Sequence, residues 1–69
     1  MSDRALSATA AELSAAAEAI GTYQRRVAAL AGPHLGTEHE DIVMAIYEAE
    51  RALRTAERTL RRAAKAAGD

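Results

Sequence analysis

The chain has 69 residues, no cysteine, two histidines and a formal net charge of −1 at pH 7. This length limits it to one domain, the lack of cysteine excludes disulfides and thiolate metal sites, and the near-neutral charge provides no global attraction to nucleic acid or membrane. The 49% of hydrophobic residues include 19 alanines, so few side chains can bury a large apolar area. We therefore expect a small domain that needs self-association or a partner for stability.

The composition also bears on where the protein is found. No apolar run approaches the length of a bilayer-spanning helix, and the first residues lack the basic and apolar segments of a signal peptide. We therefore expect a cytoplasmic protein with no membrane span. A small exported helical hairpin is an alternative.

A heptad pattern predicts a first helix from about residue 3 to residue 31. Large aliphatic residues recur every seven positions, and a second row follows each of them by three positions. The two rows are Leu6, Leu13, Ile20 and Val27, then Thr9, Ala16, Tyr23 and Leu30. Gly21 interrupts this helix and indicates a kink or a close contact with a neighbouring helix.

Residues 32–37 form the predicted turn. Gly32 is placed to take the left-handed conformation that closes a helix, and Pro33 follows to stop the helix. The sequence from Thr37 to Glu40 matches a capping box, in which Thr37 caps the next helix and Glu40 binds back to the backbone of Thr37. A second helix is therefore predicted from about residue 38 to residue 67.

The second helix repeats the heptad pattern. Its two rows are Ile46, Leu53, Leu60 and Ala67, then Ile42, Ala49, Ala56 and Ala63. Folding the chain about the turn pairs positions whose numbers sum to 69, so that Leu13 faces Ala56 and Ile20 faces Ala49. Large residues then face small ones in successive layers. The sequence predicts an all-α fold, an antiparallel two-helix coiled-coil hairpin that dimerises into a four-helix bundle.

Apolar residues outside the predicted seam suggest where a partner binds. Val43, Met44 and Tyr47 lie off the seam near the turn, and Leu35 can lie beside them. One interpretation is that long side chains cover the turn. We favour an intermolecular interface, because contiguous exposed apolar surface usually has a function.

Basic residues form a stripe on the outer face of the second helix. The stripe consists of Arg51, Arg54, Arg58, Arg61 and Lys65. Cations stabilise the C-terminal end of a helix, and acids four positions before Arg54 and Arg61 add local ion pairs, so the stripe can be purely structural. It can also bind phosphate or an acidic partner. Nucleic acid is the less favoured target, because no aromatic residue interleaves the stripe.

The chemistry of a catalytic or metal centre is missing from the sequence. His34 and His39 lie near acidic residues at the turn, which we interpret as capping and solvation. We expect no metal and no cofactor, and no enzymatic activity. The favoured function is a non-enzymatic interaction module that self-associates or docks on a partner helix. The alternative is a small regulator or architectural protein that binds nucleic acid or another polyanion through the basic stripe.

Overall fold

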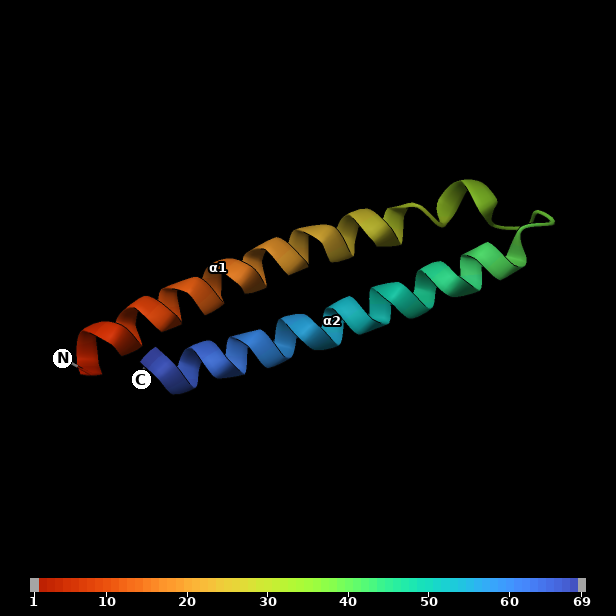
Figure 1. Ribbon diagram of the computed structural model, residues 1–69. Coiled ribbons are helices and arrows are strands. Elements are labelled where there is room, and N and C mark those ends of the chain that lie inside the picture. The colour runs from red at the N-terminus through yellow and green to blue at the C-terminus, as the bar shows by residue number, and fades with distance from the viewer. Residues whose placement is uncertain (1, 69) are drawn as a thin grey trace.

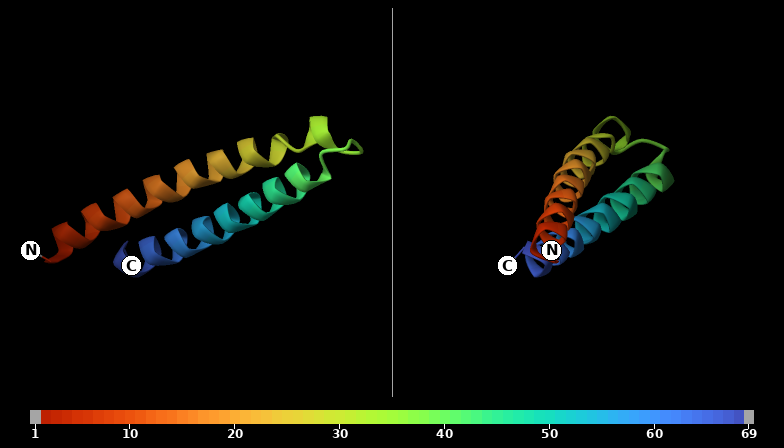
Figure 2. Two further views of the ribbon diagram at one scale, coloured as in Figure 1. Left: turned by 45° about the vertical axis from the view of Figure 1, so that its right-hand side comes forward. Right: turned by 60° about the vertical axis from the view of Figure 1, so that its left-hand side comes forward.

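The chain folds into two long antiparallel helices joined by a short turn. The computed structural model describes residues 2–68, with side chains from residue 3. Helix α1 spans Ser2–Ala29, the 3-10 helix η1 spans Gly32–His34, and helix α2 spans Glu40–Gly68. The helices lie side by side in all views (Figures 1 and 2), and the backbone measures 57 × 13 × 11 Å. The predicted all-α antiparallel hairpin is confirmed.

Helix α1 ends through a tightening of its last turn. The Leu30 N–H donates to the Val27 carbonyl at 3.0 Å, and the Ala31 N–H donates to the Ala28 carbonyl at 3.3 Å. Both bonds span three residues, as in a 3-10 helix. Pro33 has no N–H, and its ring is incompatible with the interior of an α-helix. The helix therefore ends at residue 29 and continues as the short η1.

The chain reverses direction at Gly36 rather than at Gly32. Gly36 has a φ of 72°, and it is the one residue in the described part of the chain with a positive φ. The left-handed conformation predicted at Gly32 is therefore wrong. Gly32 instead opens a right-handed 3-10 turn, in which the Leu35 N–H donates to the Gly32 carbonyl at 3.2 Å.

Helix α2 begins two residues later than predicted, and the predicted capping box is wrong. The Val43 N–H donates to the His39 carbonyl at 3.2 Å, so His39 holds the N-cap position. Thr37 Oγ1 accepts from the His39 N–H at 3.1 Å and donates to the His34 carbonyl at 2.7 Å. The Thr37 N–H also donates to the His34 carbonyl, at 3.3 Å. Because this N–H is already bonded, Glu40 does not bind back to it.

The two helices meet along a seam in which a row of small and polar residues on each helix lies beside a half-buried aliphatic row. The most buried side chains are Ala17, Ala31 and Val43, which are 0%, 2% and 2% exposed. From residue 10 to residue 31 and from residue 43 to residue 64, steps of seven from these residues give positions that are buried or half-buried. The seam positions are Ala10, Ala17, Gln24 and Ala31 from the first half, and Val43, Glu50, Glu57 and Ala64 from α2.

On each helix the observed seam positions come one residue after the members of one predicted row, so Ala17 takes the place of Ala16 and Val43 takes the place of Ile42. Tyr23, Leu30 and Ile42 were predicted to face the partner helix, but they are 56%, 58% and 41% exposed. Val43 was predicted to lie off the seam, but it is buried in it. The seam prediction is therefore wrong for one row of each helix, because the apolar pattern marks a surface that is centred beside the seam.

The predicted pairing of the helices is also wrong. Contacts across the seam pair Gly21 with Glu57, Gln24 with Glu50, and Ala10 with Gly68. The residue numbers of these pairs sum to 78, 74 and 78, whereas the predicted pairs sum to 69. The physical reason is η1, which extends beyond the end of α1 and contacts α2 there. Helix α2 is thereby shifted along α1 relative to a symmetric turn.

Candidate interaction surfaces

The residues before and after a seam position face opposite sides of the hairpin. Successive helical residues are about 100° apart, so Ile42 and Met44 flank the buried Val43 on opposite sides, where they are 41% and 64% exposed. Steps of seven from Ile42 reach three alanines, whereas steps of seven from Met44 reach three basic residues. These residues are Ala49, Ala56 and Ala63, and Arg51, Arg58 and Lys65.

Helix α1 divides in the same way. The residues before the seam positions of the first half are Thr9, Ala16, Tyr23 and Leu30, and the residues after them are Ala11, Glu18, Arg25 and Gly32. Leu30 and Gly32 lie just beyond the end of α1. Because the helices are antiparallel, residues that precede the seam on α1 and on α2 lie on the same side of the hairpin. One side of the hairpin is therefore apolar, and the opposite side is charged.

We call the first of these surfaces the apolar side. Its outer rows precede the seam positions, and its inner rows are the two large aliphatic ladders of the sequence. The outer rows are Thr9, Ala16, Tyr23 and Leu30 with Ile42, Ala49, Ala56 and Ala63; the inner rows are Leu6, Leu13, Ile20 and Val27 with Ile46, Leu53, Leu60 and Ala67. The inner rows are half-buried, apart from Leu6, which is 47% exposed. The apolar side thus covers both helices over most of their length.

One of the four predicted interface residues is buried in the structure. Leu35, Met44 and Tyr47 are 54%, 64% and 40% exposed, but Val43 is 2% exposed. Val43 therefore has no surface left for a partner while the hairpin is intact, and its assignment to the interface is wrong. Met44 and Tyr47 lie on the charged side of the seam, and Leu35 directly follows η1. A role for these three residues in binding stays a prediction.

Two acidic residues lie in the seam, which the sequence-based prediction missed. Gln24 Nε2 donates to Glu50 Oε2 at 2.6 Å across the two helices. Arg54 donates to the same oxygen from one turn further along α2. The Glu50 side chain is 14% exposed, so its aliphatic stem is buried and its carboxylate reaches the edge of the seam. The signal available in the sequence was the seven-residue spacing of Val43, Glu50 and Glu57, which places both acidic residues on the helix face that carries Val43.

Gly21 makes room for the second seam carboxylate. A Cβ atom at Gly21 would lie 3.0 Å from Glu57 Oε2, which is tighter than ordinary van der Waals contact. Arg61 donates to that oxygen through Nε at 3.3 Å and Nη2 at 3.1 Å. The predicted close contact of Gly21 with a neighbouring helix is confirmed, and α1 continues through it.

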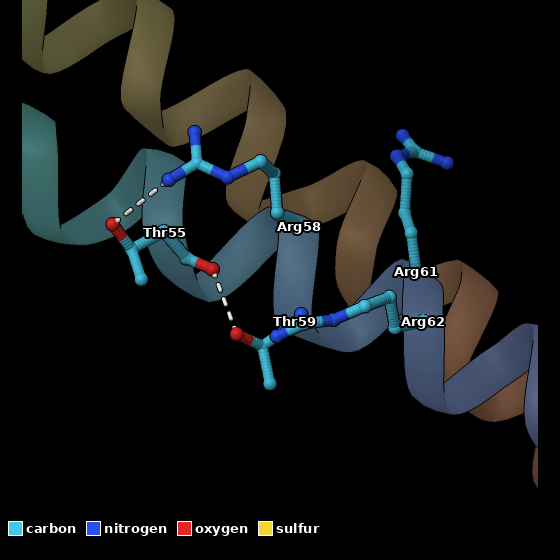
Figure 3. Close-up of a pocket in the computed structure, with 5 residues that line it drawn as sticks. All are labelled: Thr55, Arg58, Thr59, Arg61 and Arg62. Atoms are coloured by element: carbon cyan, nitrogen blue, oxygen red, sulfur yellow. Dashed lines mark hydrogen bonds between the residues drawn. The ribbon is translucent and has the colours of Figure 1, made fainter.

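The members of the basic stripe differ in their contacts. Arg54 and Arg61 bind the acidic residues four positions before them, as the structural interpretation predicted. Arg58 Nη2 donates to Thr55 Oγ1 at 3.3 Å, and Figure 3 shows its side chain bent toward Thr55 while Arg61 points away. The five residues drawn there line a shallow hollow; they are Thr55, Arg58, Thr59, Arg61 and Arg62. All five belong to α2, so this hollow is a surface of one helix and does not enclose a ligand.

The turn brings its two histidines together without building a metal site. The rings of His34 and His39 are 5.8 Å apart in an edge-to-face arrangement, and Glu38 lies 3.9 Å from His39 Nε2. Across residues 2–68 no three histidine or acidic side chains gather as metal ligands would. Neither α1 nor α2, as described, combines the length and apolarity that crossing a bilayer requires. No protein-family model, curated protein or solved structure matches the chain.

Proposed function

We propose that this chain is a non-enzymatic helical interaction module that binds another protein through its apolar side. The observation that carries the proposal is the separation of the hairpin into an apolar side and a charged side. Large residues such as Tyr23 and Leu30 are more than half exposed there. Extended apolar surface on a small protein marks a binding site or an aggregation liability.

The geometry of the apolar side supports binding over aggregation. Its rows follow the helical repeat along both helices, so it offers a regular surface into which the side chains of another helix can pack. Alanines at positions 49, 56 and 63 allow a partner backbone to approach closely. Charged residues on the opposite side keep the rest of the hairpin in contact with water.

Crosslinking from the two sides tests this proposal. A photo-reactive phenylalanine analogue is placed at Leu30 on the apolar side, or at Met44 on the charged side as a matched control. Both residues are exposed, at 58% and 64%. Irradiation in living cells should give a defined adduct from position 30 and little from position 44. No adduct from position 30, or an adduct only from position 44, would contradict the proposed function.

A second candidate is binding of a polyanion through the charged side. The observation that favours it is that Arg25 of α1 joins Arg51, Arg58 and Lys65 of α2 on this side, with Glu18 as the acidic residue of the same rows. Retention of the purified protein on DNA, falling steeply with salt, would support this candidate. Loss of that retention when Arg51, Arg58 and Lys65 are changed to glutamine would assign it to these residues.

A further inference from the structure

We infer that the partner on the apolar side is a second copy of this chain, so that two hairpins form a four-helix bundle with their charged sides outward. The inference rests on the proposed function and names its partner. It also moves the predicted dimer interface away from Leu35, Met44 and Tyr47. The exposed surface area, the small buried core and the shape of the apolar side each favour a second copy as the partner.

The hairpin exposes more surface than a compact monomer of its mass, and the excess is close to the area that one partner buries in a dimer interface. A compact monomer of 7.3 kDa has an accessible surface of about 4,200 Å². The hairpin exposes 5091 Å². The excess of about 900 Å² is close to the roughly 800 Å² that each partner buries in a standard protein interface.

The core of the hairpin is too small to support the fold alone. Among the described residues no large side chain is fully buried, and the buried apolar set consists of Ala17, Ala31 and Val43. A domain of this size without disulfides or metal needs another source of stability. Covering the apolar side with a partner supplies such a source. A second copy is the one partner that is present wherever the chain is made.

The shape of the apolar side favours a hairpin over a single helix. Its surface is two helices wide, and the backbone that carries it is 57 Å long and 13 Å wide. One added helix would cover the inner rows and leave the outer rows exposed. A second hairpin has the same width and length, and face-to-face packing of two such pairs is the arrangement of a four-helix bundle.

The molar mass of the purified protein tests the inference. Sedimentation equilibrium should give twice the chain mass of 7.3 kDa at micromolar concentration, and the thermal midpoint should rise with protein concentration. A folded species with the mass of one chain and a concentration-independent midpoint would overturn the inference. If position 30 still crosslinked to a different protein, the proposed function would stand while self-association failed.

Two matched substitutions locate the interface. Leu30→Glu places a charge on the apolar side, and Met44→Glu places the same charge on the opposite side. Because a symmetric dimer contains each change twice, Leu30→Glu should raise the dissociation constant by on the order of 100-fold or more. Met44→Glu should leave the mass unchanged. The reverse result would overturn the inference and restore the patch of Leu35, Met44 and Tyr47. If Leu30→Glu unfolds, the mass and midpoint of the unmodified protein still decide.

Discussion

The hydrogen bond between Gln24 and Glu50 distinguishes the observed seam from the one that the heptad rows predicted. In the predicted pairing, Gln24 would face Ala45 and could not reach Glu50. In the structure the two side chains are joined at 2.6 Å across the helices. We therefore predict that the substitutions Gln24→Ala and Glu50→Ala are energetically coupled.

The expected coupling follows from the contacts of Glu50. A hydrogen bond to a charged group contributes about 1.5–3 kcal/mol, and the 14% exposure of the Glu50 side chain lowers this toward about 1–2 kcal/mol because water competes at the edge of the seam. Glu50→Ala also removes the ion pair with Arg54, which contributes about 0.3–0.5 kcal/mol as an i,i+4 pair. That loss is present with or without Gln24, so it cancels from the coupling.

Urea unfolding followed by circular dichroism gives the free energy of unfolding for the two single variants and the double variant. All proteins are compared at one high concentration, so that association contributes equally. Thr22→Ala in place of Gln24→Ala is the control, because Thr22 is exposed and bonds only within its own helix, to the Glu18 carbonyl. The control should be additive within about 0.3–0.5 kcal/mol. A Gln24–Glu50 coupling no larger than the control would refute the observed seam.

Two further predictions concern the glycines. Gly36→Ala should lower the free energy of unfolding by about 1–2 kcal/mol because of the left-handed backbone at this residue, whereas Gly32→Ala, which has open space around it and no positive φ, should be nearly neutral in the same urea titration. In a protein that already carries Glu57→Ala, adding Gly21→Ala should raise the free energy of unfolding by about 1 kcal/mol, because alanine favours the helix over glycine. With Glu57 present the gain should be smaller, since the carboxylate must move. Equal gains in both backgrounds would contradict the contact.

The existence of the two helices and their antiparallel arrangement could be predicted because both signals are local. Heptad rows and helix-favouring residues define the helices, and Pro33 with Gly36 interrupts them. The position of the left-handed residue was not predicted, because two glycines flank the proline and either can reverse the chain. The choice depends on the 3-10 turn that forms between them.

The seam could not be predicted from the apolar rows alone. Those rows lie partly against the other helix of the hairpin and partly on the exposed apolar side. The apolar pattern alone therefore does not show which residues lie in the seam. Glu50, Glu57 and Gln24 are residue types that are usually exposed to solvent. In the structure Gln24 and Glu50 bond to each other across the seam, and Glu57 lies in the space that Gly21 leaves. Val43 was predicted to lie off the seam. Its neighbours Ile42 and Met44 are apolar too, so residue type does not identify which of the three is buried.

The most direct test of self-association through the apolar side uses the two tyrosines of the chain. Tyr23 lies on the apolar side, and Tyr47 lies on the charged side. Isotope-labelled and unlabelled protein are mixed, refolded together and examined for nuclear Overhauser effects between different copies. We predict intermolecular effects from the Tyr23 ring to aliphatic methyl groups of the apolar side, and none from the Tyr47 ring. Intermolecular effects from Tyr47 alone, or none from either ring in a folded sample, would contradict the account.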